Sequence, residues 1–242
     1  MKPEVGESLN FLTLIDNFQH IFKLLIINQA NMKRILSSVL TGIILLFVAG
    51  CATVYTAPEI QQPDNNKTIA ILPFDVQVQY NKLPKNVTIE QVHENERELS
   101  LIMQGQIYNR FLQKKHLFPV AFQDVDQTNM LLRRNNIDLE KLGEFSKDEL
   151  ARLLEVDEII TGVVYTTKPM STGAAVALGV LFGVWGPTNQ AEVTVSLHSG
   201  IDSQLLWKFN HVYSGSVGSS PDQLSKAMMK PISRKFPYKQ RS

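Results

Sequence analysis

The sequence predicts an α/β fold, a two-layer or α-β-α sandwich with a mixed central sheet of about five strands, preceded by a signal peptide and a flexible tether. Residues 68–74 (TIAILPF) form a continuous apolar run, typical of a strand buried on both faces. Residues 89–115 repeat apolar side chains at helical spacing, and residues 191–209 alternate apolar and polar side chains around a turn. Strands that alternate with helices along a chain indicate an α/β sandwich.

Residues 32–50 have the composition of an export signal. Met32 is followed by two basic residues and then by an apolar run of about 14 residues that ends in small residues. A membrane-spanning helix needs roughly 20 apolar residues, so this run is too short to be a retained span.

The end of this signal resembles the lipobox of bacterial lipoproteins. Val48, Ala49 and Gly50 precede Cys51, the only cysteine of the chain. The resemblance implies that Cys51 is the first residue of the mature protein and carries a diacylglycerol thioether and an N-acyl chain, with no other cofactor. With this resemblance, the alanine at position 52 is compatible with the periplasmic face of the outer membrane, which is the expected location, and the inner membrane and the cell surface stay open.

Residues 1–31 precede the signal, and we expect them to be a misassigned upstream extension. A genuine cytoplasmic extension is the alternative. Residues 1–50 hold four of the 24 basic and three of the 23 acidic residues, which leaves 20 of each in residues 51–242. This balance lacks the basic excess of a nucleic-acid-binding protein, so no nucleic-acid partner is expected.

The mature chain is predicted to begin with a flexible tether over residues 51–67, because Pro, Gln, Asn and Asp dominate there. The α/β domain then covers residues 68–235. Its first strand, 68–74, runs on or gives way to a second short strand over 75–80. A helix follows over 89–115, since Thr88 and Gln91 form a capping-box pattern.

The second half of the domain continues the alternation. An edge strand is expected within 117–122, a helix over 125–135 that Asp124 caps, and a short helix after the capping box at 146–149. A strand follows over 158–166. A last helix begins after Ser220 and ends or kinks at Pro231, and residues 236–242 are expected to be a loose tail.

Residues 173–186 (GAAVALGVLFGVWG) contain no charged side chain. Three interpretations stay open: a helix or strand packed in the core, a surface loop that contacts lipid or a partner, and a glycine-rich phosphate loop that lacks the usual fingerprint. The contact interpretation would use the large apolar side chains of the segment, which are Val176, Leu178, Val180, Leu181, Phe182, Val184 and Trp185.

Several of these segments together resemble periplasmic domains of the TolB amino-terminal type, which include the curli secretion-channel (CsgG) family and the penicillin-binding-protein activator LpoB. Residues 69–74 are similar to their first strand. Residues 150–164 are similar to a second segment, with Asp157 and Gly162 at the expected places, and residues 193–207 are similar to their hairpin. The resemblance covers about residues 67–230 and implies an αβ sandwich.

An enzyme is not expected. The lone cysteine is the expected lipidation site, and a Gly-x-Ser-x-Gly motif is absent. His93 and His116 fall on one predicted helix, whereas His198 and His211 fall on opposite faces of the hairpin, so no pair has metal-ligand spacing. No catalytic residue and no metal are therefore predicted.

The sequence favours a membrane-anchored periplasmic lipoprotein that acts as a binding or assembly module of the cell envelope. Its expected partners are the membrane, through the anchor, and an envelope protein or further copies of the chain. Two alternatives remain: a subunit of a secretion or transport pore, and an activator of a cell-wall synthase.

Overall fold

The computed structural model of the chain describes residues 52–58, 60, 67–80, 87–168, 190–214 and 220–240. The predicted upstream extension, the signal peptide with its lipobox, Cys51 and the apolar segment 173–186 lie outside the described residues. From Ala52 onward the chain forms a compact unit of its own. Within the described ranges, none of the helices is both long and apolar enough to span a bilayer.

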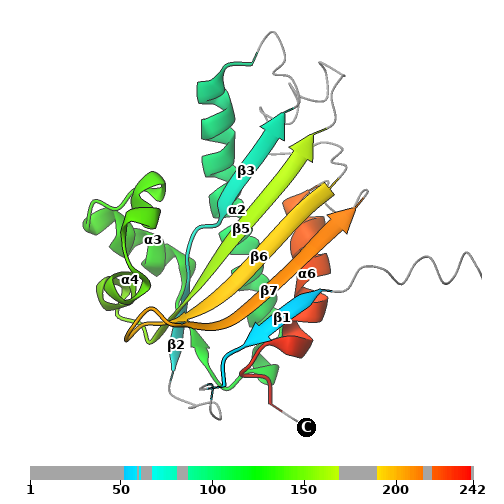
Figure 1. The fold of residues 1–242 in the computed structure, drawn as a ribbon. Helices are drawn as coiled ribbons and strands as arrows, with labels where there is room; N and C mark the ends of the chain where they lie inside the picture. Colours follow the sequence, from blue (N-terminus) through cyan, green and yellow to red (C-terminus); the bar gives the residue numbers. More distant parts are fainter. Residues whose placement is uncertain are drawn as a thin grey trace, which may run out of the picture. The chain divides into compact units, whose positions relative to one another are not determined.

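A mixed sheet is the centre of the domain (Figure 1). Its strands follow the order β1-β7-β6-β5-β2-β4, and β3 also pairs with β5. β5 is parallel to β2 and β3 and antiparallel to β6, and the antiparallel pairing continues through β7 to β1. The strands are β1 (Thr53–Thr56), β2 (Thr68–Ile71), β3 (Asp75–Tyr80), β4 (Ala121–Phe122), β5 (Glu158–Lys168), β6 (Gln190–Ser199) and β7 (Leu205–Ser214). The α/β class is confirmed, with seven strands where the sequence predicts about five.

The helices begin at the caps that the sequence indicates. Both capping boxes form, with Thr88 and Gln91 at the start of the first helix and Ser146 and Glu149 at the start of the third. The last helix continues past Pro231, where the sequence predicts an end or a kink, because residues on both sides of the proline are packed in the core. The helices are α2 (Ile89–Gln113), α3 (Val125–Arg134), α4 (Lys147–Leu154) and α6 (Pro221–Lys235), with short 3-10 turns η1 (Lys115–Leu117) and η2 (Leu139–Glu144).

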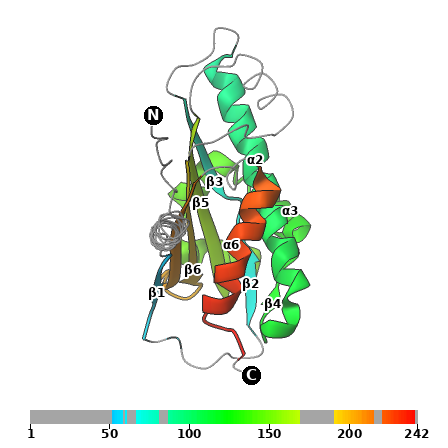
Figure 2. The same ribbon diagram turned by 90° about the vertical axis from the view of Figure 1, so that its right-hand side faces the viewer.

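The two faces of the sheet are covered to different extents. α2 and α6 pack side by side over one face and enclose the main core, which includes Met103, Trp207 and Met228 (Figure 2). On the other face α3 and α4 cover only the end that contains β2 and the start of β5, where Ala70 packs against Leu150. No helix among the described residues covers the remainder of this second face, which we call the open sheet face.

Two segments that the sequence predicts to be mobile are built into the fold. Residues 53–56 of the predicted tether form β1 against β7, so the flexible-tether prediction is wrong there. The predicted loose tail is also ordered over its first part, since Phe236 and Tyr238 are each only 2% exposed. The Tyr238 hydroxyl donates a hydrogen bond to the buried carboxylate of Glu158, which also pairs with Lys67 at 2.5 Å. These contacts fix the C-terminal segment to the start of β5.

Candidate functional site

A cleft of about 490 Å³ opens beside the uncovered part of the sheet. Its volume falls within the usual range for ligand pockets, roughly 300–1,000 Å³. Segments far apart in the sequence form it: the β2–β3 connection, α2, η2, the start of α4 and the middle of β5. Its lining residues are Leu72, Pro73, Phe74, Asp75, Val76, His93, Glu96, Arg97, Ser100, Leu139, Glu140, Leu142, Gly143, Lys147, Thr161, Gly162 and Val163.

A bulge between β2 and β3 shapes the floor of this cleft. Ile71 lies opposite Ile160, and Asp75 lies opposite Val163. Between these two pairs the β2–β3 segment therefore contains one residue more than β5, which defines a bulge. The ring of Phe74, which is 1% exposed, lies directly on Gly162. A Cβ at position 162 would be 2.1 Å from the Phe74 Cε1 atom. Glycine at 162 is therefore required by the packing of the bulge.

Asp157 also has a structural role. Its carboxylate accepts a hydrogen bond from the Thr68 backbone N–H at 2.7 Å, and its carbonyl accepts one from the Gly200 N–H at 2.9 Å. The residue thereby joins the start of β2 to the β6–β7 turn. Asp157 and Gly162, which carry part of the sequence resemblance, thus both have structural roles.

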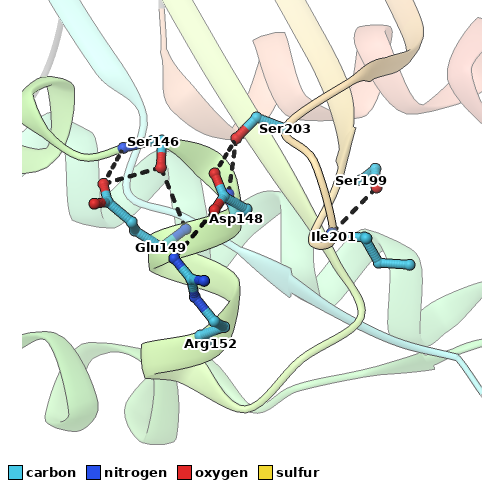
Figure 3. Close-up of polar contacts among 7 residues, drawn as sticks. All are labelled: Ser146, Asp148, Glu149, Arg152, Ser199, Ile201 and Ser203. Atoms are coloured by element: carbon cyan, nitrogen blue, oxygen red, sulfur yellow. Dashed lines mark hydrogen bonds and ion pairs between the residues drawn. The ribbon is translucent and has the colours of Figure 1, made fainter.

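Hydrogen bonds to the β6–β7 turn hold the start of α4 in place (Figure 3). The Ser203 hydroxyl donates to the Asp148 carboxylate at 2.7 Å and accepts from the Asp148 backbone N–H at 2.9 Å. Arg152 forms an ion pair with the same carboxylate at 3.1 Å. Hydrogen bonding to the Ser146 and Ser203 side chains lowers the pKa of Asp148. These contacts fix the position of Lys147, the first residue of α4.

The α2 wall of the cleft is charged, and most of its charges have partners. Glu96 accepts a hydrogen bond from the Val78 backbone N–H at 2.7 Å and contacts His93 at 3.1 Å. The Glu96 carboxylate therefore accepts from a backbone N–H group on the outer edge of β3. That N–H group is then not available to pair with an added strand. Arg97 bridges the cleft to Glu140 of η2 at 3.3 Å.

Lys147 differs from these neighbours because no carboxylate pairs with it within the described ranges. Its side chain is partly buried, and burial lowers the pKa of its ammonium group. The pKa of His198 is also lowered, first by burial and further by the charge of Lys147. A cation in the first turn of a helix also opposes the helix dipole. Lys147 is thus a partly buried cation that lacks a paired anion among the described residues.

The open sheet face continues from the cleft with exposed apolar side chains. Val163 and Tyr165 of β5 and Val212 of β7 are 39%, 37% and 38% exposed. Tyr165 and Val212 both lie opposite Glu192 of β6, on either side of it, so they belong to one cross-strand row. The Tyr165 hydroxyl donates a hydrogen bond to Gln79. Apolar and polar groups therefore alternate on this surface.

The structure does not describe the site residues predicted from the sequence. Cys51, the lipobox and the seven apolar residues of 173–186 lie outside the described residues, so those predictions stay untested. The prediction that His198 and His211 fall on opposite faces of the hairpin is confirmed: His211 contacts Phe209 and Tyr213 on the core side, whereas His198 is on the other face near Ser203. Among the described residues, no three His, Cys, Asp or Glu side chains gather in a metal-binding arrangement.

Lys147 was missed by the sequence analysis, although one signal was available. Its position directly after the capping serine places a cation at a helix N-terminus, where acidic side chains are favoured. Such a local conflict between sequence and structure often marks a functional position.

Comparison with known proteins finds structural likenesses only. No family model matches the chain, and no curated protein sequence matches it. A PelC dodecamer from Paraburkholderia phytofirmans is similar at 12% identity and a TM-score of 0.40, over 80% of this chain and 99% of that chain. The lipoprotein GNA1162 from Neisseria meningitidis is similar at 10% identity and a TM-score of 0.43, over 70% and 99%. The LpoB C-terminal domain from Salmonella enterica is similar at 10% identity and a TM-score of 0.30, over 61% and 82%. Likenesses at this level assign no family, activity or partner to the chain.

Proposed function

We propose that the protein is a lipoprotein of the bacterial cell envelope, anchored through acyl chains on Cys51, whose α/β domain is a non-catalytic binding module. We place the anchor on the periplasmic face of the outer membrane, with which the alanine after the cysteine is compatible. The partner is an envelope protein or a second copy of the chain, and it binds at the cleft and the adjoining open sheet face.

The anchor is supported by the order of features at the start of the mature chain. A basic start, a short apolar run and three small or aliphatic residues lead directly to the lone cysteine. β1 begins at Thr53, two residues after Cys51. Two residues of extended chain span about 7 Å, so the lipid would hold one edge of the sheet close to the bilayer. Three acyl chains would make this attachment firm.

The observation that carries the binding role is that no described carboxylate pairs with the ammonium group of Lys147. A partly buried ammonium group without a carboxylate gains most from an anion that a ligand supplies. Leu72, Leu139 and Leu142 line the same cleft and would receive an apolar side chain. The geometry therefore fits a polypeptide segment that carries an apolar side chain next to a carboxylate.

The other polar groups of the cleft support binding rather than catalysis. Glu96 is engaged by the Val78 N–H and by His93, and Arg97 is engaged by Glu140. A general base or nucleophile has to be free to exchange a proton with a substrate. These side chains instead hold α2, β3 and η2 together, and we propose that the domain performs no chemical step.

Site-specific photo-crosslinking in intact cells tests this function. A photoreactive residue at Val163 in the cleft should form an adduct with one envelope protein, or with a second copy, which would be recognised by its doubled mass. The matched control position is Leu112, which is similarly exposed at 39% on α2 but does not line the cleft.

Charge reversal at Lys147 completes the test. Lys147→Glu should abolish the adduct at position 163, whereas Lys147→Arg should retain it, because an arginine still supplies the cation. The same adducts at positions 163 and 112, or an adduct that is insensitive to Lys147→Glu, would contradict the proposed site. Thermal unfolding of each variant shows that the fold is intact.

A further inference from the structure

The end of the chain is strongly basic although residues 51–242 are balanced in charge. After Asp222 the sequence contains six lysine and arginine residues and no aspartate or glutamate. Charge of one sign in a single segment points to a partner of the opposite sign.

The structure gathers these charges on one surface. Along α6, the buried positions include Leu224, Met228 and Ile232, which pack into the core. The basic residues occupy the solvent-facing positions between and beyond them. We call Lys226, Lys230, Arg234, Lys235 and Lys239 the basic strip, and all five are exposed.

None of the five side chains forms an ion pair with another described residue. The nearest acidic position along the helix, Asp222, already pairs with Arg110 of α2 at 2.6 Å. Lysine and arginine side chains on a helix surface commonly have i,i+4 acidic partners, which stabilise the helix by a few tenths of a kcal/mol. The strip therefore keeps its charges available for a ligand outside the domain.

Part of the strip lies close to the start of the described chain. Arg234, Lys235 and Lys239 line a hollow together with Thr56 and Ile60, and Thr56 is the last residue of β1. Thr56 is five residues after Cys51, a distance of at most about 18 Å of extended chain. Side chains so close to a membrane anchor lie within about one or two Debye lengths of the headgroup layer.

We propose that the basic strip binds the anionic headgroups of the bilayer that holds the anchor, and that this contact orients the domain on the membrane. The inference rests on the proposed lipid anchor at Cys51. Clusters of four to eight basic residues next to a membrane anchor are typical of anionic-lipid contacts. The acyl chains fix the distance of the domain from the bilayer, and the strip on α6 determines which side faces it.

Lysine footprinting of the complete lipidated protein tests this contact. The protein is reconstituted into nanodiscs of phosphatidylcholine alone, or of phosphatidylcholine with phosphatidylglycerol, and acetylated with a water-soluble ester. Residue-resolved mass spectrometry then gives the acetylation rate of each lysine. The rates at Lys226, Lys230, Lys235 and Lys239 should fall by about threefold or more in the anionic discs and recover at high salt. The rate at Lys141 of η2 should not change.

Paired charge reversals provide the control. Lys230→Glu with Arg234→Glu should abolish the difference between discs at the remaining strip lysines. Arg133→Glu with Arg134→Glu reverses two exposed charges on α3 and should leave that difference unchanged.

The possible results distinguish failure of the headgroup contact from failure of the lipid anchor. Protein that enters neutral discs but shows equal lysine rates in both lipids would overturn the headgroup contact and retain the anchor. Protection that requires added cell-wall glycan would also overturn the contact, in favour of a polyanionic polymer as the ligand. Protein that fails to enter neutral discs would overturn the anchor and the headgroup contact that depends on it.

Discussion

Replacement of Gly162 by alanine should destabilise the domain by on the order of 3 kcal/mol. The added methyl group would be 2.1 Å from Cε1, 2.2 Å from Cδ1 and 2.5 Å from Cζ of Phe74. Phe74 is 1% exposed, so its ring cannot move aside without displacing the core around it. Urea unfolding followed by far-UV circular dichroism measures the effect. With a slope of about 2 kcal/mol per molar, the midpoint should fall by about 1.5 M.

A double-mutant cycle with Phe74 provides the stricter test. Phe74→Ala should cost about 3–5 kcal/mol by itself, because it empties a buried ring site. The double variant should be no less stable than Phe74→Ala, since the new methyl group enters the space that the ring has left. Additive losses would refute the proposed packing, because residues in contact must couple.

Gly105 is the matched control for this cycle. It lies within α2 and a Cβ at this position meets nothing within 4 Å. Gly105→Ala should stabilise the domain by up to about 1 kcal/mol, because alanine favours the helix. A similar loss at positions 105 and 162 would show that the effect of Gly162→Ala is unrelated to Phe74.

Three further predictions concern polar contacts. Tyr238→Phe should lower the stability by about 1–3 kcal/mol in urea unfolding, because the buried Glu158 carboxylate loses a hydrogen-bond donor; an unchanged midpoint would contradict the ordered C-terminal segment. Ser203→Ala should cost about 1–2 kcal/mol through the lost contacts with Asp148, and Ser203→Gly should cost less, because φ at this position is 63° and glycine relieves the strain. Burial lowers the pKa of His198 from its ordinary value of 6.5. Just below pH 6.5 the His198 side chain is therefore protonated more in the unfolded chain than in the folded domain. Stability should therefore rise with pH between the folded pKa and 6.5, and His198→Gln should reduce that slope; an unchanged pH profile would contradict this role.

Much of the fold could be predicted from local signals. The capping box before α2 and the one before α4 both form, because the side chains that satisfy the first N–H groups of each helix are local in sequence. The alternation of the β6–β7 hairpin is likewise a local pattern, and it assigns His198 and His211 to opposite faces as the structure does.

The features that could not be predicted depend on distant partners. β1 has no continuous apolar run, and its pairing with β7 is what makes Thr53–Thr56 a strand. Tyr238 is ordered by Glu158, which is 80 residues away in sequence. The bulge separates β2 from β3 where Phe74 packs on Gly162. This contact joins residues far apart in the sequence, so no local sequence pattern indicates it. The cleft has the same origin, since its walls come from segments between residues 72 and 163.

Intact-mass measurement of the mature protein from envelopes tests the lipoprotein assignment most directly. We expect a chain that begins at Cys51 and carries the added mass of a diacylglycerol thioether and an N-linked acyl chain. A mature protein that retains residues upstream of Cys51, or that has an unmodified thiol at this position, would contradict the anchor and the membrane orientation inferred from it.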